Sequence, residues 1–417
     1  MSNYTVHLSF RDVFTRNLVN ANIRFPIKTF GNDRGLKVCC VVTKMKYIVI
    51  VFIIICFVSC NKKQNIDVSN VTMPDGRTVK VFHLQNKQGI SVDVMEYGAT
   101  ILNIFTPDRS GNFNDILAGY DSIETYFRDQ SYFGCVVGRF ANRIAEGKFM
   151  LDSVEYKLNK NEKNINHLHG GINGLNKKLW KGNLIIADHS QAVKLSYISP
   201  DGEEGYPGNL DITVTYTLND SNELKMDFIA KTDKATVVNL TNHLYYNLSD
   251  SCKTSILEHQ LQVNANSFLK VNKNLIPVGA ASSVENTPFD FREPKTIGKD
   301  IYAPDSQFIY CGGYDHNFIL NRNNNDNLNF AVRLYEPTSG RVLELFTNQP
   351  GLQFYSGNFL NGNIIGKKGR VYKKYDALAL EAQKFPDSPN HCNYPSTELQ
   401  IGQTYNHNTV LRFKIVE

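Results

Sequence analysis

The 417-residue chain contains the stretch Leu210-Asp-Ile-Thr-Val-Thr-Tyr-Thr-Leu218, in which apolar and polar residues strictly alternate. A period of two places successive side chains on opposite faces of a β-strand, so this stretch predicts a strand with one buried face. The same alternation recurs in Ser91–Met95, Val193–Ile198 and Leu224–Ala230. The pattern therefore favours a sheet of many half-buried strands.

Turn-forming residues separate these strands, and helical periodicity is rare. Examples of turns are Pro74-Asp-Gly76, Asp201-Gly202 and Thr338-Ser-Gly340. Ile123–Phe127 is at most a short helical turn, and the Asn-rich stretch Asn321–Asn329 is interpreted as the tip of a hairpin. We therefore expect an all-β protein, a large sandwich or barrel with few short helices.

The basic charge is concentrated near the N-terminus. The chain holds 45 Lys and Arg and 40 Asp and Glu, and residues 1–60 account for eight of the former and two of the latter. The remainder is therefore almost neutral, without the basic surface that nucleic-acid binding requires. We expect no nucleic-acid partner.

An apolar run of twelve residues, Tyr47–Val58, follows Met45-Lys46 and precedes Ser59-Cys60. A basic start, a short apolar stretch and a small residue before the cleavage point are typical of a secretory signal peptide. Twelve residues rise only about 18 Å as a helix, too little to cross a bilayer. Phe57-Val-Ser-Cys60 also resembles a bacterial lipobox, in which Cys60 carries the lipid.

These features predict four segments. Residues 1–44 are a gene-prediction extension or an atypical leader, 45–60 a lipoprotein-type signal peptide, 61–75 a polar tether and 76–417 one β domain. We accordingly expect an exported protein of a bacterial cell envelope, held at a membrane by an N-terminal lipid anchor.

The cysteines of the β domain are Cys135, Cys252, Cys311 and Cys392, which are widely separated. They form no CxxC motif and no metal-ligand spacing, so we expect neither a catalytic thiol nor a disulfide framework. Whether any single disulfide forms is left open by the sequence.

A carboxylate interrupts an apolar stretch in Asp376-Ala-Leu-Ala-Leu-Glu-Ala-Gln-Lys-Phe-Pro-Asp387. A buried charge is costly unless it is paired or used, and burial raises the pKa of a carboxyl toward the range of a general base. Glu381 is therefore a candidate catalytic base. The alternative is a structural Glu paired with an Arg or Lys.

Six further segments place polar residues among apolar ones. They are Gly138–Ile144, Asn166–Gly171, Asp201–Gly208, Asn239–Asn247, Gly313–Phe318 and Pro350–Phe359. Together with the Glu381 strand, these segments resemble the motifs of the aldose 1-epimerases, also called galactose mutarotases, in the same order. The resemblance extends from about Thr78 to Phe413.

The resemblance implies a β-supersandwich with a shallow sugar cleft and a reaction that needs no metal or cofactor. It implies that Glu381 is the general base and His243 the general acid. Tyr245 matches a position that lines the cleft, where Phe318 and Trp180 are further aromatic candidates. The positions that would hold sugar hydroxyls are Asn142, Arg143, His169, Asp315 and Gln353.

Each of these residues also has a purely structural interpretation. His243 could be a hydrogen-bonded core histidine, and His169 before Gly170-Gly171 could only shape a turn. Arg143 could pair with Asp152 or Glu146 at the surface, Asp315 could cap a turn and Gln353 could bond to strand backbone. His167 and His169 share a strand face, but no Glu or Cys constellation accompanies them, so we expect no metal.

The resemblance predicts interconversion of the α and β anomers of free hexoses such as glucose or galactose. The same fold could instead serve a lipid-anchored sugar-binding protein without turnover. A third hypothesis is an epimerase of a phosphorylated sugar, which would require additional Arg or Lys in the cleft. The preferred sugar and the oligomeric state are not predictable from the sequence.

Overall fold

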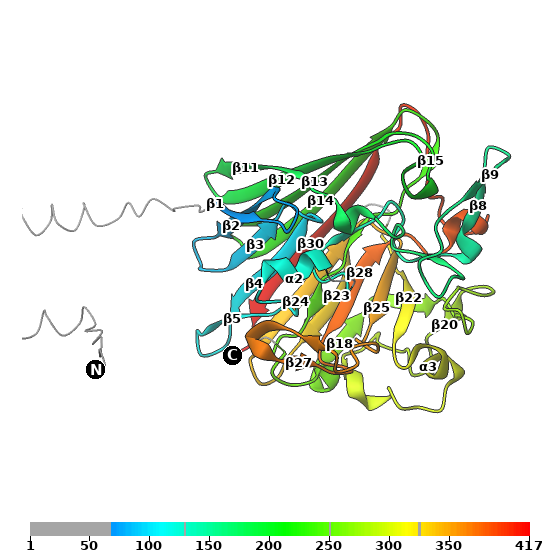
Figure 1. The fold of residues 1–417 in the computed structure, drawn as a ribbon. Coiled ribbons are helices and arrows are strands. Elements are labelled where there is room, and N and C mark those ends of the chain that lie inside the picture. The colour runs from blue at the N-terminus through cyan, green and yellow to red at the C-terminus, as the bar shows by residue number, and fades with distance from the viewer. Residues whose placement is uncertain (1–67, 129–130, 250–251, 324–326) are drawn as a thin grey trace, which may run out of the picture. The chain divides into compact units, whose positions relative to one another are not determined.

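The structure is a computed structural model that describes residues 68–128, 131–249, 252–323 and 327–417. They belong to one compact unit, Ile66–Glu417. Among the described residues the only α-helices are α2 (Ile123–Arg128) and α3 (Ser306–Cys311); all other regular elements are strands or single 3₁₀ turns (Figure 1). The prediction of an all-β protein is confirmed.

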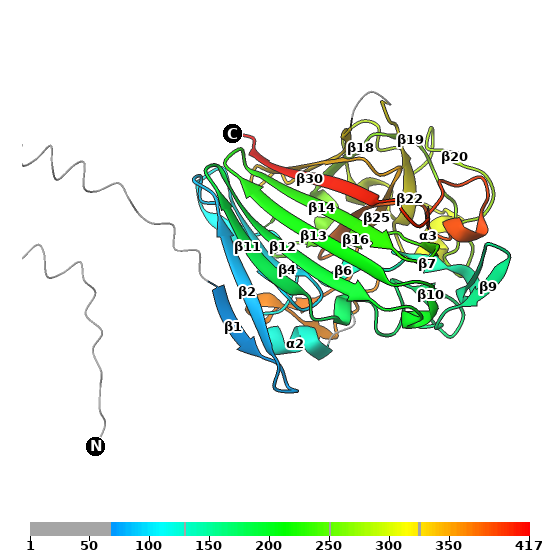
Figure 2. The same cartoon turned by 90° about the horizontal axis from the view of Figure 1, so that it is seen from above.

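The largest sheet has nine antiparallel strands, and Figure 2 shows its long members side by side. In spatial order they are β11 (Lys181–Ala187), β12 (Ser190–Ser199), β13 (Leu210–Asn219), β14 (Glu223–Thr232), β30 (Tyr405–Ile415), β24 (Arg341–Thr347), β23 (Asn329–Tyr335), β18 (Gln260–Val263) and β21 (Lys295–Thr296).

A second sheet has six strands and carries Asp315, Gln353 and Glu381. Its order is β17 (Tyr245–Tyr246), β28 (Leu378–Gln383), β25 (Gly351–Tyr355), β22 (Asp315–Leu320), β19 (Ala265–Phe268) and β20 (Ser282–Ser283). The N-terminal sheet follows chain order, with β1 (Val68–Thr72), β2 (Thr78–Gln85), β3 (Ser91–Met95), β4 (Thr100–Pro107) and β5 (Phe113–Asp115).

Short strand pairs and 3₁₀ turns complete the unit. The pairs are β6 (Val136–Val137) with β16 (Thr241–Asn242), β7 (Arg143–Ile144) with β10 (His167–Leu168), β8 (Lys148–Leu151) with β9 (Val154–Lys157), β15 (Thr236–Val237) with β29 (Glu398–Leu399), and β26 (Ile364–Ile365) with β27 (Val371–Tyr372). The 3₁₀ turns are Ala145–Gly147, Leu175–Lys177, Glu203–Gly205, Ile256–Glu258, Ile297–Lys299, Lys367–Gly369 and Ser388–Asn390.

The strands predicted from period-two alternation form as expected. In β13 every apolar residue from Leu210 to Leu218 is buried and the intervening residues are exposed or half-buried. Val214 lies opposite Phe228 of β14, so the apolar faces of neighbouring strands coincide. All three sheets contribute to one hydrophobic core, through residues such as Val92, Val214 and Phe354.

The six-stranded sheet has one apolar and one polar face because its strands also alternate. Leu378, Leu380 and Ala382 of β28 belong to the hydrophobic core. Glu381 lies between them in sequence, so its side chain projects from the opposite face. The fold thereby places a carboxyl on a strand that is paired on both sides, between β17 and β25.

Two expectations about segments need correction. Residues 61–75 were expected to be a tether; residues 61–67 lie outside the described residues, but Val68–Thr72 forms β1 and pairs with β2 in continuous register. Without β1, the backbone of β2 would be an unpaired edge of the sheet, and β1 pairs with that edge. The Asn-rich stretch is not a hairpin tip, because β22 before it and β23 after it belong to different sheets.

The predicted signal peptide and its lipidation site, Cys60, lie outside the described residues. Within the described part of the chain, no helix is long and apolar enough to cross a membrane. Cys135, Cys252, Cys311 and Cys392 are all free.

Candidate active site

A cavity of about 270 Å³ lies on the polar face of the six-stranded sheet. Its walls come from segments far apart in the sequence, and they contain both charged and aromatic side chains. The lining residues are Ser131, Tyr132, Asn142, Arg143, Leu168, His169, His243, Tyr245, Asp315, Tyr355, Phe359, Leu360, Ile364 and Glu381. All predicted site residues except Gln353 and Cys60 are therefore brought together here.

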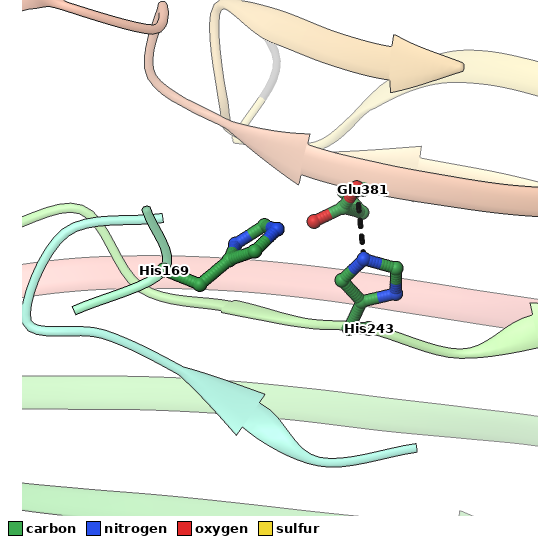
Figure 3. Close-up of side chains that lie close together, drawn as sticks. All are labelled: His169, His243 and Glu381. Atoms are coloured by element: carbon green, nitrogen blue, oxygen red, sulfur yellow. Dashed lines mark ion pairs between the residues drawn. The ribbon is translucent and has the colours of Figure 1, made fainter. Parts of the chain in front are cut away.

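Glu381 and His243 face each other across this cavity (Figure 3). His243 Nε2 lies 3.7 Å from Glu381 Oε1, which is too long for a direct hydrogen bond. The main chain fixes His243, because its N–H donates to Cys135 O at 2.9 Å and its carbonyl accepts from Gly134 N at 2.9 Å. The ring of Tyr245 lies parallel to the imidazole at 4.8 Å.

Burial dominates the ionisation of this pair. Glu381 is 2% exposed, and burial raises its pKa to about 8; Asp315 adds to the rise and Arg143 opposes it. Burial lowers the pKa of His243 to about 4. At pH 7 the free pair is therefore uncharged, with one proton on Glu381 and a neutral imidazole, and the contact is not an ion pair.

His169 and Asn142 hold each other in place. His169 N donates to Asn142 O at 2.9 Å, and Asn142 N donates to His169 Nδ1 at 3.2 Å. Both residues have positive φ, 50° and 64°. Because Nδ1 of His169 accepts a hydrogen bond, the ring proton is on Nε2, and burial holds the pKa of His169 well below its usual value. His169 is thus a neutral donor at the cavity.

Arg143 links the cavity to a half-buried carboxylate that the sequence did not indicate. Its Nε and Nη2 donate to Glu162 at 2.7–3.0 Å, and Nη1 lies 3.9 Å from Asp315 Oδ2. Burial opposes the charge of Arg143, but Asp315 and Glu162 together raise its pKa. The predicted surface partners, Asp152 and Glu146, are not its partners.

Gln353 is not among the residues that line the cavity, but it contacts one of them. Its Nε2 donates to Asp315 Oδ1 at 2.7 Å. The contact of Gln353 with a sugar hydroxyl stays a prediction, and in the structure the side chain supports Asp315. Trp180 and Phe318 also do not line the cavity, because both are buried in the main core. Tyr245 does line it.

Three aromatic residues of the cavity wall were not predicted as site residues. Tyr132 carries no motif signal that distinguishes it from a core aromatic residue. Tyr355 and Phe359 both belong to the Pro350–Phe359 segment that had been singled out, and Phe359 is 57% exposed although it lines the cavity. Membership of that segment was the one available clue.

Glu381, His243 and His169 could together suggest a metal centre, because their potential ligand atoms lie within 4.8 Å of one another. The surroundings of the two imidazoles do not fit that role. A ligating histidine normally donates its second N–H to an acceptor. Nδ1 of His169 instead faces the Asn142 N–H donor, and Nδ1 of His243 has no partner among the described residues. The trio is arranged for proton transfer and hydrogen bonding.

Two other motif histidines are structural. His167 Nε2 bonds the Tyr206 hydroxyl at 2.6 Å and its Nδ1 bonds Asn159 O at 2.7 Å. His316 is fully buried next to Cys311 and Gln307. The Asp201–Gly208 loop is structural as predicted: Glu204 accepts the main-chain N–H groups of Ile172 and Asn173.

The cavity brings a carboxyl on a β-strand opposite an imidazole, an arrangement suited to proton transfer on a small polar molecule. The family model of aldose 1-epimerase matches residues 80–412, and the chain belongs to that family. It is 43% identical to the galactose mutarotase of Bos taurus over 338 residues, 81% of this chain and 95% of the relative. It is 36% identical to the aldose 1-epimerase of Escherichia coli K12 over 82% and 96% of the two chains.

Solved structures give the same result for the fold. An aldose epimerase homologue from C. elegans is 31% identical, with a TM-score of 0.73 over 84% of this chain and all of the other. The galactose 1-epimerase of Lactobacillus acidophilus is 29% identical, with a TM-score of 0.74 over 85% of this chain and all of the other. The predicted galactose mutarotase-type fold is confirmed.

Proposed function

We propose that this isomerase interconverts the α and β anomers of free hexoses, with Glu381 and His243 as its acid–base pair. The observation that carries the proposal is a buried carboxyl that lies 3.7 Å from a buried imidazole in a cavity of about 270 Å³. Galactose and glucose are the proposed substrates, in keeping with relatives named galactose mutarotase.

The proposed reaction needs two coupled proton transfers. Glu381 removes the proton of the C1 hydroxyl while His243 protonates the ring oxygen, and the bond between C1 and the ring oxygen breaks. The open aldehyde rotates about C1–C2, and closure on the other face reverses both transfers. Each positioned acid or base typically contributes about 10²–10⁴-fold to the rate.

The resting proton must move before this step. In the free pair the single proton is on Glu381, whereas the reaction as assigned starts from a carboxylate and an imidazolium. Both arrangements hold one proton, so transfer across the 3.7 Å gap converts one into the other without exchange with solvent. A bound sugar hydroxyl is suited to carry it.

The remaining polar residues would hold the sugar away from C1. Asn142, His169, Arg143 and Asp315 line the cavity and present directional donors and acceptors. Tyr245, which lies parallel to His243, offers a flat face to the sugar C–H groups. The open form can then rotate at C1 while its far hydroxyls stay bound.

The phosphorylated-sugar hypothesis is not favoured by the cavity. Arg143 is the one Lys or Arg among its lining residues, and Glu162 already binds this guanidinium through Nε and Nη2. A phosphate group would require additional cations.

The decisive experiment is the anomerisation rate of freshly dissolved α-D-galactose and α-D-glucose, followed by polarimetry. We expect the chain from residue 61 to accelerate it and the Glu381→Gln variant to lose the acceleration while still binding sugar. Glu155→Gln, at an exposed position of β9, is the control and should behave like the parent. If the folded parent binds both sugars without accelerating either reaction, a sugar-binding protein is the better description.

We further propose an exported form anchored through lipid on Cys60, as the sequence around Tyr47–Val58 suggests. Expression of the full chain in a bacterium should give a membrane-bound product whose N-terminal peptide carries acyl groups by mass spectrometry. Cys60→Ala should abolish acylation. Recovery of an unprocessed parent chain without lipid would refute the anchor, and it would leave the catalytic proposal untouched.

A further inference from the structure

Three rows of side chains cross the polar face of the six-stranded sheet, each running over β22, β25 and β28. The strand registers define them as Asp315, Tyr355 and Ala379; Asn317, Gln353 and Glu381; and Ile319, Gly351 and Gln383. The second and third rows hold three amide side chains in addition to the catalytic carboxyl. Only Glu381 of these two rows lines the cavity.

These amides are buried and carry unused hydrogen-bonding groups. Asn317, Gln353 and Gln383 are each at most 3% exposed. Neither amide atom of Asn317 or Gln383 has a partner among the described residues, and the same holds for Gln353 Oε1 and Glu381 Oε2. A buried polar group without a partner costs about 1–3 kcal/mol, so such a concentration needs a reason.

Amides that only brace this fold look different. Asn247 donates to the carbonyls of Thr254 and Asp376 at 2.6 Å. Gln307 accepts from Val271 N and donates to Val271 O. These two amides thus bind backbone. Asn317 and Gln383 do not, although they are equally buried.

Gly351 makes room for this arrangement. It lies opposite Gln383, and a Cβ at this glycine would come within 2.7 Å of Asn317 Oδ1 and 2.9 Å of Phe385 Cδ1. The Asn317 amide therefore extends over Gly351 toward the third row, and the Phe385 ring also packs there. The absence of a side chain at residue 351 leaves the space between Asn317 and Gln383 open on this face.

We propose that Asn317 and Gln383 are positioning residues for Glu381. Their amide N–H groups bind Oε2 of the Glu381 carboxylate directly or through one ordered water. Gln353 has its orientation fixed by donating to Asp315, so its Oε1 is free to accept from the same amides or from the protonated carboxyl. The row can then support Glu381 in both states that the reaction uses. This inference rests on the proposed role of Glu381.

The pKa of Glu381 also depends on the other groups that face it. They are His243 and His169, which are neutral at pH 7, Asp315 of β22, and Arg143 of β7 with its partner Glu162. None of them changes when a neutral amide is replaced. Donors stabilise the ionised carboxyl, so their removal should raise the pKa of Glu381, by about one pH unit for each lost hydrogen bond.

The test is an infrared titration of the carboxyl band that the parent shows and Glu381→Gln lacks. It needs neither sugar nor turnover, so its outcome is separate from that of the anomerisation assay. We expect the midpoint to rise in Gln383→Met and in Asn317→Leu. Gln349→Met is the matched control, because Gln349 is equally buried, precedes β25 and donates to Asn348 instead; its midpoint should equal the parent's.

Unchanged midpoints in both folded variants would overturn the proposal, as would equal rises in the control. If a variant does not fold, a high-resolution crystal structure of the parent decides. An amide nitrogen of Asn317 or Gln383 bound to Glu381 Oε2, or sharing one water with it, supports the proposal. Amides that bind only each other or the backbone refute it.

Discussion

Glu381 and His243 together carry one proton at neutral pH, because burial shifts the pKa of both groups. The pKa of Glu381 is raised to about 8 and that of His243 is lowered to about 4. Between these values the pair keeps one proton, and in the proposed mechanism the pair rather than either residue defines the active state. The two side chains would then act as one proton-carrying unit.

This unit predicts the pH dependence of catalysis. We expect kcat/KM for anomerisation to be level between about pH 4 and about pH 8. It should fall above this range, because the pair loses its only proton, and below it, because the pair gains a second. Polarimetric rates of the parent, corrected for the spontaneous reaction, measure the profile. An activity that continues to rise above pH 8 would contradict the shared proton.

Stability should depend on the same carboxyl. The pKa of Glu381 is 4.5 in the reference state and about 8 in the folded protein, so the folded state holds this proton more tightly. Its contribution to stability is complete below pH 4.5 and is lost as the pH rises through 8. The free energy of unfolding should therefore fall across this window, by up to about 5 kcal/mol at 1.36 kcal/mol per pH unit.

Urea unfolding at a series of pH values tests this expectation. Glu381→Gln should flatten the curve between pH 4.5 and pH 8, because the amide has no proton to lose. Glu155→Gln, at an exposed position, should keep the slope of the parent. Identical slopes in the parent and Glu381→Gln would show that ionisation of this carboxyl does not oppose folding.

Residues that line the cavity were predictable from the sequence, but their contacts were not. Glu381 stands out because it is a carboxylate directly after the apolar run Ala377–Leu380. The contacts of Glu162 with Arg143 and of Gln353 with Asp315 depend on a neighbour on another strand or loop. Tertiary packing determines long-range partners of this kind, and the local sequence does not indicate which residues they are.

At the level of elements, the turn that carries His169 depends on the glycine that follows it. Gly170 has φ of 86°, and a Cβ there would lie 1.6 Å from the carbonyl oxygen of Gly138. No small adjustment relieves such an overlap, because both partners are backbone. The close approach of the two loops places Asn142 and His169 on the same side of the cavity.

Gly170→Ala should therefore be strongly destabilising, by about 3 kcal/mol or more. Gly202→Ala is the matched control: its φ of 83° is similar, but nothing lies within 4 Å of the added Cβ. We expect it to cost only about 1 kcal/mol of backbone strain. Chemical denaturation of both variants measures the difference, and equal losses would mean that positive φ alone explains the glycine.

Element type was predictable because period two is a local signal, whereas strand pairing was not. Leu210–Leu218 and Leu224–Ala230 became neighbours joined by a tight turn, as adjacent hairpin strands do. Asn321–Asn329 has the same polar composition as a hairpin loop, yet it connects strands of two sheets. The sequence of a loop indicates that the chain turns, but it does not indicate which sheet the next strand joins.

For the whole molecule, the folded unit begins near Ile66 and includes β1. We expect a chain that starts at residue 61 to match the full chain in thermal stability and anomerisation rate. A chain that starts at Met73 loses β1, leaves β2 as an uncovered edge and should unfold at a lower temperature. Calorimetry of the two truncated chains tests this; equal melting temperatures would make β1 dispensable.

The two-faced strand β28 also limits how this site can change over time. Leu380 faces the core and Glu381 faces the cavity, and one residue separates the two environments. A single-residue insertion or deletion between Ala377 and Glu381 would exchange the faces, sending the carboxyl inward and leucines into the sugar site. Descendants of this protein can therefore alter the site by substitution, while the length of this strand is inherited unchanged.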